Sequence, residues 1–555
     1  MLLESQIDVQ DLDHLGIIAG IVDDIGIVEI IDRELGKHPQ EKVSAGQAVK
    51  AMILNCMGFL TSPLYLFSEF FAGKATEHLI GEGVTAEHLN ESRLGRVMDQ
   101  LYEYGITLMF VKIATEMCKK FGISTNHAHL DGTSIAVHGK YETKKEEGIE
   151  EEESIVENES GEPVAITITQ GYSRDHRPDL KQFTWHLMTS EEEGIPLYMN
   201  VGNGNKTDQS AFPEVIKAFR SEWEGEQPEL YVMDAAFYSE ANLQEFGNSI
   251  EWISRVPATL KAAQELTESL SSEQFSEQYD KKGYRFCVVC STYAGIKQQW
   301  VVVESLQRME ADLKTVAKKI ENALNEQGKA LKSLINKSFA CEADALNAVG
   351  VFEKTLKYHN LSELQIVSQP HYLQRGRPNP DQQPTHYSWH IQATLVENPV
   401  TIATKRQQAG RFILATNSLD SQKWADSDIL REYKGQQSTE RGFRFLKDPL
   451  FFASSVFLKN SKRIMALAML MTLALMVYTL GQRQLRLALA QANASLPDQK
   501  GKPTTRPTLR WILQCFLSVH LVFLNNLKFQ IKLSDRQNLI LQFLGASSRK
   551  YYFLS

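Results

Sequence analysis

The order of apolar runs between residues 128 and 256 constrains the fold of this 555-residue chain more than any other feature. Continuous or alternating apolar runs predict strands, and helical spacing of apolar residues predicts helices at 212–219 and 239–246. The expected strands lie at 128–137, 163–171, 183–189, 197–201, 229–233 and 251–256. Thr207 and Asp208 are suited to cap the first of the two helices. Strands interleaved with helices in this way predict an α/β fold with a mixed sheet.

A long interval separates this region from the next expected strand, Arg411–Thr416, and the helix after it. The preceding elements have the order of an RNase H-like sheet that lacks only its last helix. The interval of roughly 150 residues must therefore be an insertion, because a structureless loop of that length is improbable. Its expected elements are strands at 284–290 and 300–304, a helix with Met309, Leu313, Val316, Ile320 and Leu324 on one face, and a Pro/Gly/Arg linker at 370–384. The predicted fold is an RNase H-like mixed-sheet core interrupted by an α+β insertion domain.

Helical spacing dominates both ends of the chain. A helix is expected over 43–54 with Ser44 as its N-cap, and a second over Leu94–Leu101. These patterns divide the chain into a helical N-terminal domain (1–120), the first part of the core (121–258), the insertion domain (259–408), the second part of the core (409–480) and a basic helical C-terminal region (481–555).

The charges of the chain are segregated. The net charge of −9 opposes binding to a polyanion on average. However, residues 459–555 contain 14 Lys and Arg against two Asp, a balance of +12. Residues 142–160 contain nine Glu against two Lys, a balance of −7, and are expected to form a solvated excursion between two strands. The basic tail is therefore compatible with a nucleic-acid partner.

Three features bear on the cellular compartment. The six scattered cysteines favour a reducing environment, and the alternating residues around Cys287 and Cys290 predict a strand rather than a metal site. The N-terminus lacks the basic and apolar segments of a signal peptide. The apolar run Ile464–Leu480 has 17 residues, the lower limit for spanning a membrane, and is expected to be a buried core helix. We expect a cytoplasmic protein that contacts no membrane.

Three carboxylates stand out because of their settings. Asp131 lies within the first strand, Asp234 follows the strand that ends at Met233, and Glu440 lies on a helix expected to run from Tyr433 to Lys447. Tyr433, Glu440 and Lys447 are seven residues apart, about 700° of helix rotation, so they are expected on one face. Carboxylates on adjacent strands and on a helix across the sheet can hold a pair of Mg²⁺ ions for phosphodiester chemistry.

Several motifs resemble those of bacterial insertion-sequence DDE transposases with a large insertion between the second Asp and the Glu. They are His129-Leu-Asp131-Gly-Thr-Ser, Gly171-Tyr-Ser-Arg-Asp-His-Arg-Pro-Asp-Leu-Lys-Gln182, Gly204-Asn-Lys-Thr-Asp208, Met233-Asp-Ala-Ala-Phe-Tyr, Ile253-Ser-Arg-Val-Pro257 and the Tyr433, Glu440 and Lys447 series. The resemblance covers most of residues 10–480 in order. It implies that Asp131, Asp234 and Glu440 are the catalytic metal ligands, and that Tyr433 and Lys447 contact the end of the element. It also implies two Mg²⁺ ions, for which Mn²⁺ can substitute.

One position departs from the family signature Y-x2-R-x3-E-x6-K, since Gln436 stands where Arg is expected. Gln keeps hydrogen-bonding reach but loses a charge, so Lys434 or Arg444 could take over the phosphate contact. The residues expected to bind DNA are Tyr433, Lys447, Arg444, Gln436, Arg174, Arg177, Lys181 and, by stacking on a base, Trp300.

The resemblance predicts cut-and-paste transposition of an element bounded by terminal inverted repeats. The expected partners are double-stranded DNA, as terminal repeats and as target, and a second copy of the chain in a synaptic homodimer. The N-terminal domain could bind the repeats or dimerise, although it has no clear helix-turn-helix signature. We expect a bacterial cytoplasmic, nucleoid-associated enzyme. Two alternatives remain at this point: an RNase H-like metal-dependent nuclease without strand transfer, and a non-catalytic transposase-derived DNA-binding protein.

Overall fold

The computed structural model describes residues 7–59, 66–138, 164–373, 383–420, 423–448, 460–524, 527–530 and 533–553. The Glu-rich run at 142–160 and residues 374–382 of the expected linker lie outside these ranges. The chain forms two compact units. The first contains Met1–Ser254, Thr292–Lys297 and Thr416–Ser555, and the second contains Arg255–Ser291 and Gln298–Ala415.

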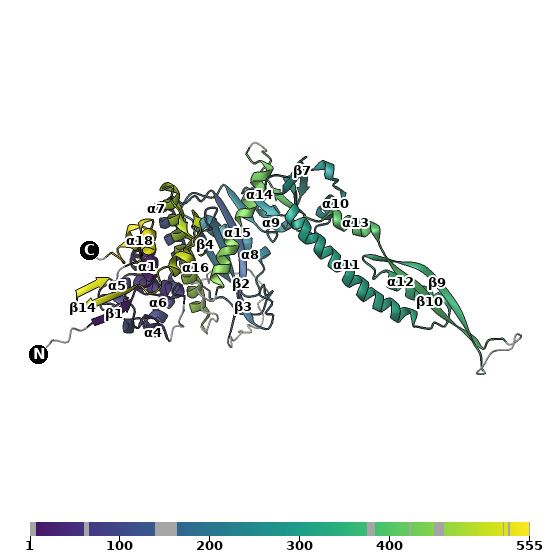
Figure 1. Cartoon of the computed structure of the whole chain (residues 1–555), viewed down its shortest axis with the longest axis horizontal. Helices are drawn as coiled ribbons and strands as arrows, with labels where there is room; N and C mark the ends of the chain where they lie inside the picture. The colour runs from purple at the N-terminus through teal and green to yellow at the C-terminus, as the bar shows by residue number, and fades with distance from the viewer. Residues whose placement is uncertain are drawn as a thin grey trace. The chain divides into compact units, whose positions relative to one another are not determined.

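A mixed sheet organises the first unit (Figure 1). The first five of its eight strands are β2 (His127–Val137), β3 (Lys181–Ser190), β4 (Pro196–Gly202), β5 (Leu230–Met233) and β6 (Trp252–Arg255), in the spatial order β4-β3-β2-β5-β6. β2, β3 and β4 pair antiparallel, whereas β5 pairs parallel with both β2 and β6. Helices α8 (Asp208–Glu222) and α9 (Glu240–Phe246) lie between these strands in the chain. This arrangement confirms the predicted RNase H-like mixed sheet.

Local capping explains where several helices begin. Ser44 accepts a hydrogen bond from the backbone of Gln47 at the start of α3 (Ala45–Cys56), in a complete capping box. Thr207 accepts one from Ser210 at the start of α8, and Ser239 does the same for α9. The caps expected at Ser44 and Thr207 are thus confirmed.

The strand expected at 163–171 is wrong for the part that the structure describes. From residue 164 onward the segment contains only an isolated antiparallel bridge between Thr169 and Gln182. Its other bonds lead to the turn after β4: Gly204 donates to the Thr167 carbonyl and the Asn203 side chain accepts from the Thr167 amide. Because the backbone groups of Thr167 are hydrogen-bonded to this turn, they are not available for a ladder of hydrogen bonds with β3.

Helices of the N-terminal region surround one long apolar helix, α16 (Ser461–Gln491). The helices that contact it include α1 (Leu15–Ile25), α3, α6 (Glu91–Tyr104) and α7 (Ile106–Phe121). Among the described residues, α16 is the one helix long and apolar enough to cross a membrane, but 89% of its most apolar window is buried inside the protein. It is the core helix that the sequence predicted.

The two ends of the chain also meet in the first unit, because β1 (Ile7–Asp11) pairs antiparallel with β14 (His520–Leu524). The remaining elements of this unit are α2 (Ile27–Leu35), α4 (Phe67–Phe71), α5 (Thr76–Ile80), η2 (Ala86–His88), α14 (Asp426–Gly435), α15 (Gln437–Leu446), β12 (Leu496–Pro497), β13 (Pro503–Thr504), α17 (Leu509–Gln514), β15 (Leu527–Gln530), α18 (Asp535–Gln542) and α19 (Ala546–Arg549).

The second unit contains most of β7 (Tyr284–Tyr293) and β8 (Ile296–Ser305), as the sequence predicted, and the 30-residue helix α11 (Leu306–Ile335). Its small apolar core brings Ala345 and Val349 against Ile391. A buried cluster centres on Glu304, which accepts hydrogen bonds from Tyr279, Arg285 and Arg411. The other elements are α10 (Lys261–Ser269), η3 (Ser272–Gln274), α12 (Glu342–Glu353), β9 (His359–His371), β10 (His386–Glu397), α13 (Pro399–Gln407) and β11 (Arg411–Thr416).

Candidate active site

Adjacent parallel strands place the first two carboxylates side by side. Leu130 of β2 pairs in register with Met233, the last residue of β5, so Asp131 and Asp234 follow at the same level. Asp131 is buried, with 8% of its surface exposed, and its Oδ1 accepts a hydrogen bond of 2.8 Å from the Gly132 amide. Asp234 is half-buried, and its Oδ1 accepts one of 2.8 Å from the Ala236 amide. The register of two strands therefore fixes the spacing of this pair.

Glu440 is exposed on α15, which lies across β2 and β3. Thr439, next to it in the chain, has its hydroxyl 2.7 Å from that of Thr189 on β3. Gly442, about 200° around the helix from Glu440, faces Leu475 of α16, where an added Cβ would lie 3.1 Å from Leu475 Cδ2. The sheet and the core helix together hold the Glu440 helix in place.

The charges of Asp234 and Glu440 act on Asp131. The pKa of Asp131 is raised to about 7, chiefly by burial and next by the charge of Asp234, with a further contribution from Glu440. The Arg174 guanidinium and the Gly132 amide act in the opposite direction. This repulsion agrees with the geometry, in which β5 pairs with β2 in register and α15 contacts β2. A bound cation would relieve the repulsion.

Arg174 is a cation that lies beside Asp131. Its Nη1 lies 3.8 Å from Asp131 Oδ1 and donates to the Gly132 carbonyl, while its Nη2 donates to Asp208 at the start of α8. Asp208 also lies 3.2 Å from Nε2 of His186, whose pKa is lowered to about 3 by burial, so the neutral ring donates to the carboxylate. A Cβ at Gly132 would lie 2.6 Å from Asp208 Oδ1, so only glycine permits this approach.

Sequence reasoning missed the roles of His186 and Asp208 in supporting Arg174. The sequence shows Asp208 as a possible helix cap and as the last residue of a family motif, and neither feature predicts its contact with Arg174. A signal is present at His186, which interrupts the largely apolar run Phe183–Met188 of a strand that is buried from Gln182 onward. A histidine in that setting needs a hydrogen-bonding partner from elsewhere in the fold.

The expected single helix from Tyr433 to Lys447 is wrong, because α14 ends at Gly435 and α15 begins at Gln437. The Gln436 amide donates to the carbonyl of Tyr433, a three-residue spacing that tightens the turn between the two helices. Glu440 is therefore in the first turn of α15 and Lys447 follows its last residue. Tyr433, half-buried, belongs to the preceding helix.

The DNA contact expected of Gln436 is also wrong in the observed conformation. Its side chain is 5% exposed, and its Nε2 donates to the carbonyl of Leu130 over 3.2 Å. This bond ties the junction of the two helices to the residue before Asp131. The amide of Gln436 thus positions the helices on β2 instead of facing solvent.

Trp300 does not lie where a base could stack on it. It is 3% exposed within β8, among the buried residues Val301, Val302 and Val303, so the expected stacking is wrong for this conformation. The apolar run around it favours burial of the indole over exposure.

The other expected DNA contacts are accessible to different degrees. Arg177 is exposed but paired with Asp179, and Lys181 is half-buried at the start of β3. Lys447 is half-buried and donates to Asp175 over 2.8 Å, and Arg444 is exposed on α15. Arg174 and Asp175 thus connect the loop before β3 to both Asp131 and Lys447.

A separate cluster joins the start of β2 to α14. His127 Nδ1 lies 2.7 Å from Glu191 and 2.9 Å from Glu432, and these two hydrogen bonds raise the pKa of His127 to about 9. The three side chains are close enough to surround a metal ion. However, a protonated imidazole has no lone pair to offer, and Arg431 also pairs with Glu432. The cluster is best described as a structural ion network.

The sheet order and the three carboxylates define the class of protein, an RNase H-like enzyme of phosphodiester chemistry. Two family models match the chain: "Transposase DDE domain" over residues 124–477, and "Domain of unknown function (DUF4277)" over residues 7–115. The first covers 354 of the 555 residues (477 − 124 + 1), and the chain belongs to the DDE transposase family. This match confirms the resemblance. The protein is a DNA transposase, of a family that depends on divalent metal ions.

A solved structure with some similarity is the cryo-EM structure of the piggyBac transposase synaptic complex with hairpin DNA. The sequences are 9% identical, the similarity covers 98% of this chain and 84% of that chain, and the TM-score is 0.35. No curated protein sequence matches the chain.

Proposed function

We propose that this transposase binds the terminal inverted repeats of an insertion sequence, cuts the DNA at both ends and joins the freed 3′ ends to target DNA. The observation that carries the proposal is the convergence of Asp131, Asp234 and Glu440 from β2, β5 and α15. These acids are separated by 103 and 206 residues in the sequence (234 − 131 and 440 − 234). Their proximity is therefore produced by the tertiary fold and not by local structure.

The donor set fits magnesium. All three candidate ligands are carboxylates, the oxygen donors that Mg²⁺ and Mn²⁺ prefer, and burial together with the charges of the other two acids raises the pKa of Asp131. We therefore assign Asp131, Asp234 and Glu440 as the ligands of two Mg²⁺ ions, for which Mn²⁺ can substitute. When bound, such ions supply Lewis-acid activation of the attacking oxygen and stabilise the leaving oxygen.

Other residues position the site and the DNA. Arg174 balances the charge of Asp131, and Asp208 and His186 hold Arg174 in place. Lys447 and Tyr433 are proposed to contact the phosphate backbone, with a phosphate replacing Asp175 beside Lys447. Arg177, Lys181 and Arg444 are proposed as further backbone contacts. The hydroxyl that attacks comes from water or from DNA, so no covalent link between protein and DNA is needed.

The assembly and location are part of the same proposal. Two element ends must be cut together, so we infer a homodimer in the synaptic complex, with the N-terminal helices as the region that binds the repeats or joins the two copies. We place the enzyme in the bacterial cytoplasm, associated with the nucleoid.

The test is a cleavage assay with Mg²⁺ on a duplex that contains the terminal repeat. Asp234→Ala and Glu440→Gln should lower the cleavage rate by about a thousandfold or more, at least about 4 kcal/mol of transition-state stabilisation. Both variants should still bind the duplex. Glu240→Gln, which changes an exposed glutamate on α9, is the matched control and should cleave at the wild-type rate.

A plasmid added as target distinguishes the alternatives. Strand-transfer products are expected for a transposase, whereas cleavage without joining would indicate a nuclease. Binding without either reaction in the wild type would indicate a non-catalytic derivative. Wild-type cutting by Asp234→Ala or Glu440→Gln would overturn the assignment of the acids.

A further inference from the structure

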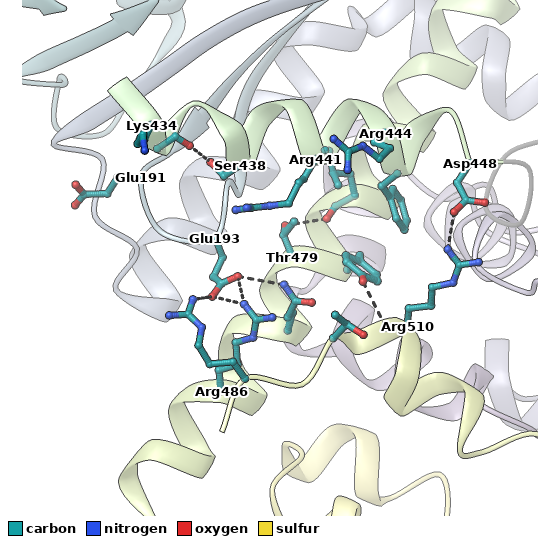
Figure 2. Close-up of a pocket in the computed structure, with 18 residues that line it drawn as sticks. Glu191, Glu193, Lys434, Ser438, Arg441, Arg444, Asp448, Thr479, Arg486 and Arg510 are labelled. Carbon is teal, nitrogen blue, oxygen red and sulfur yellow. Dashed lines mark hydrogen bonds and ion pairs between the residues drawn. The ribbon is translucent and has the colours of Figure 1, made fainter. Parts of the chain in front are cut away.

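A cationic groove is lined in part by α15, the helix that carries Glu440. Its volume is about 670 Å³, and it is lined by α14, α15, α16 and the segment around the start of α17. In Figure 2, Arg441 and Arg444 come from α15, whereas Thr479 and Arg486 come from α16. Phe445, Leu475 and Tyr478 give the groove an apolar portion.

The charge of the groove is positive even after its internal ion pairs are counted. Six cations line it against Glu191, Glu193 and Asp448, which leaves a balance of +3 (6 − 3). The six cations are Lys434, Arg441, Arg444, Arg486, Arg506 and Arg510. Glu191 is already paired with His127, which is protonated, so it does not neutralise the groove cations.

The pairing pattern leaves two arginines available. Glu193 takes up Arg486 and Arg506, and Asp448 pairs with Arg510 (Figure 2). Arg441 and Arg444, by contrast, are exposed and make no ion pair with any residue in the described ranges. Exposed cations that converge on a hollow without carboxylate partners suit a ligand that carries several negative charges.

The position of the groove relative to Glu440 narrows the choice of ligand. Arg441 follows Glu440 by one residue, about 100° around α15, and Arg444 follows by four residues, about 40°. Ser438, Gly442 and Phe445 also line the groove and lie about 140–160° around α15 from Glu440, so the Arg444 edge of the groove is the part near the face that carries Glu440. A polyanion that passes the acids could continue directly into the groove.

We propose that this groove binds the sugar–phosphate backbone of DNA a short distance from the bond that is cut. The proposal rests on the proposed function in one respect, that DNA is the substrate at Glu440. The proposal adds four arginines to the DNA-binding surface: Arg441, Arg486, Arg506 and Arg510. The last three belong to the basic C-terminal region. Contacts of this kind fix the position of a strand and carry no sequence information.

The test measures DNA affinity against salt concentration for full-length Arg441→Ala, on α15, and Arg506→Ala, in the segment before α17; both residues line the groove. Each variant should bind DNA roughly three- to tenfold more weakly, with a salt slope lower by about one, because one phosphate contact is lost. Arg441→Lys should restore most of the affinity. Arg220→Ala, an exposed arginine on α8 outside the groove, is the control and should match the wild type.

Two duplexes identify the source of the backbone. Equal losses on a terminal-repeat duplex and on an unrelated duplex indicate a contact used with any DNA, and a loss confined to one of them assigns the groove to the element end or to the target. If both variants bind both duplexes with the affinity and the salt dependence of the wild type, the proposal that this groove binds DNA is wrong. The cleavage rate of Arg220→Ala should equal that of the wild type, whereas failure of the wild type to cut would instead overturn the proposed function.

Discussion

Two helices of nearly equal length, α16 with 31 residues and α11 with 30, occupy opposite environments. Eighteen residues of α16 are buried, against three of α11. α16 is apolar around its whole circumference over Ile464–Leu480 and is covered by helices and by β4. α11 alternates Lys and Glu with isolated leucines and packs against β10 and α13. The contribution of a helix to stability therefore depends mainly on how much apolar surface it buries, and only weakly on its length.

The difference matters for function because α16 supports the site. Leu475 of α16 packs against Gly442 of α15, two residues after Glu440, and α16 also forms one wall of the cationic groove. The stability of the first unit and the geometry of its acids thus depend on the same helix. The second unit has a small core, and much of α11 faces solvent.

The largest expected effect comes from removing a core side chain of α16. Leu473 is fully buried, so Leu473→Ala should lower the free energy of unfolding of the first unit by about 3–5 kcal/mol, through lost transfer energy and the cavity left behind. Urea unfolding followed by circular dichroism measures this loss. A loss below about 1 kcal/mol would mean that α16 is not packed as a core helix.

An effect of intermediate size is expected in the pH dependence of the stability of the first unit, which contains His127. The pKa of His127 is raised to about 9 by its hydrogen bonds to Glu191 and Glu432, above an unfolded value of about 6.5. A raised pKa stabilises the protonated folded form, so this contribution is complete below pH 6.5 and disappears as pH rises through 9. The first unit should lose up to about 3 kcal/mol over that window.

The matched variant for this titration is His127→Gln, which removes the ionisable ring and keeps a donor. Its unfolding free energy should vary less between pH 6 and pH 9.5 than that of the wild type. If the two proteins lose the same stability over this range, His127 is not the group responsible and the ion network contributes little.

The smallest expected effect repeats the leucine substitution in the other helix. Leu324 of α11 is 46% exposed, so Leu324→Ala should change the unfolding free energy of the second unit by no more than about 0.5 kcal/mol. The same urea experiment applies, with Leu473→Ala for comparison. A cost near that of Leu473→Ala would show that a partner covers α11 in solution, and the contrast between the helices would then fail.

Much of the fold was predictable because its signals are local. Strand alternation placed β2, β3, β4, β5 and β6, and the hydroxyl caps Ser44 and Thr207 placed the starts of α3 and α8. The segment from residue 164 to 171 misled this reasoning. Its apolar residues alternate as a strand does, but the turn at Asn203 and Gly204 captures its backbone groups.

For the site, the sequence determined which acids occur and on which elements, since residue identity and periodicity are written in the chain itself. The tertiary structure decided what surrounds them: that Gln436 faces Leu130 instead of solvent, that Trp300 is buried, and that Arg174 is held beside Asp131 by a carboxylate on α8. These contacts join residues up to about 300 positions apart. No local pattern encodes them, because they depend on which faces the packed sheet and helices turn toward one another.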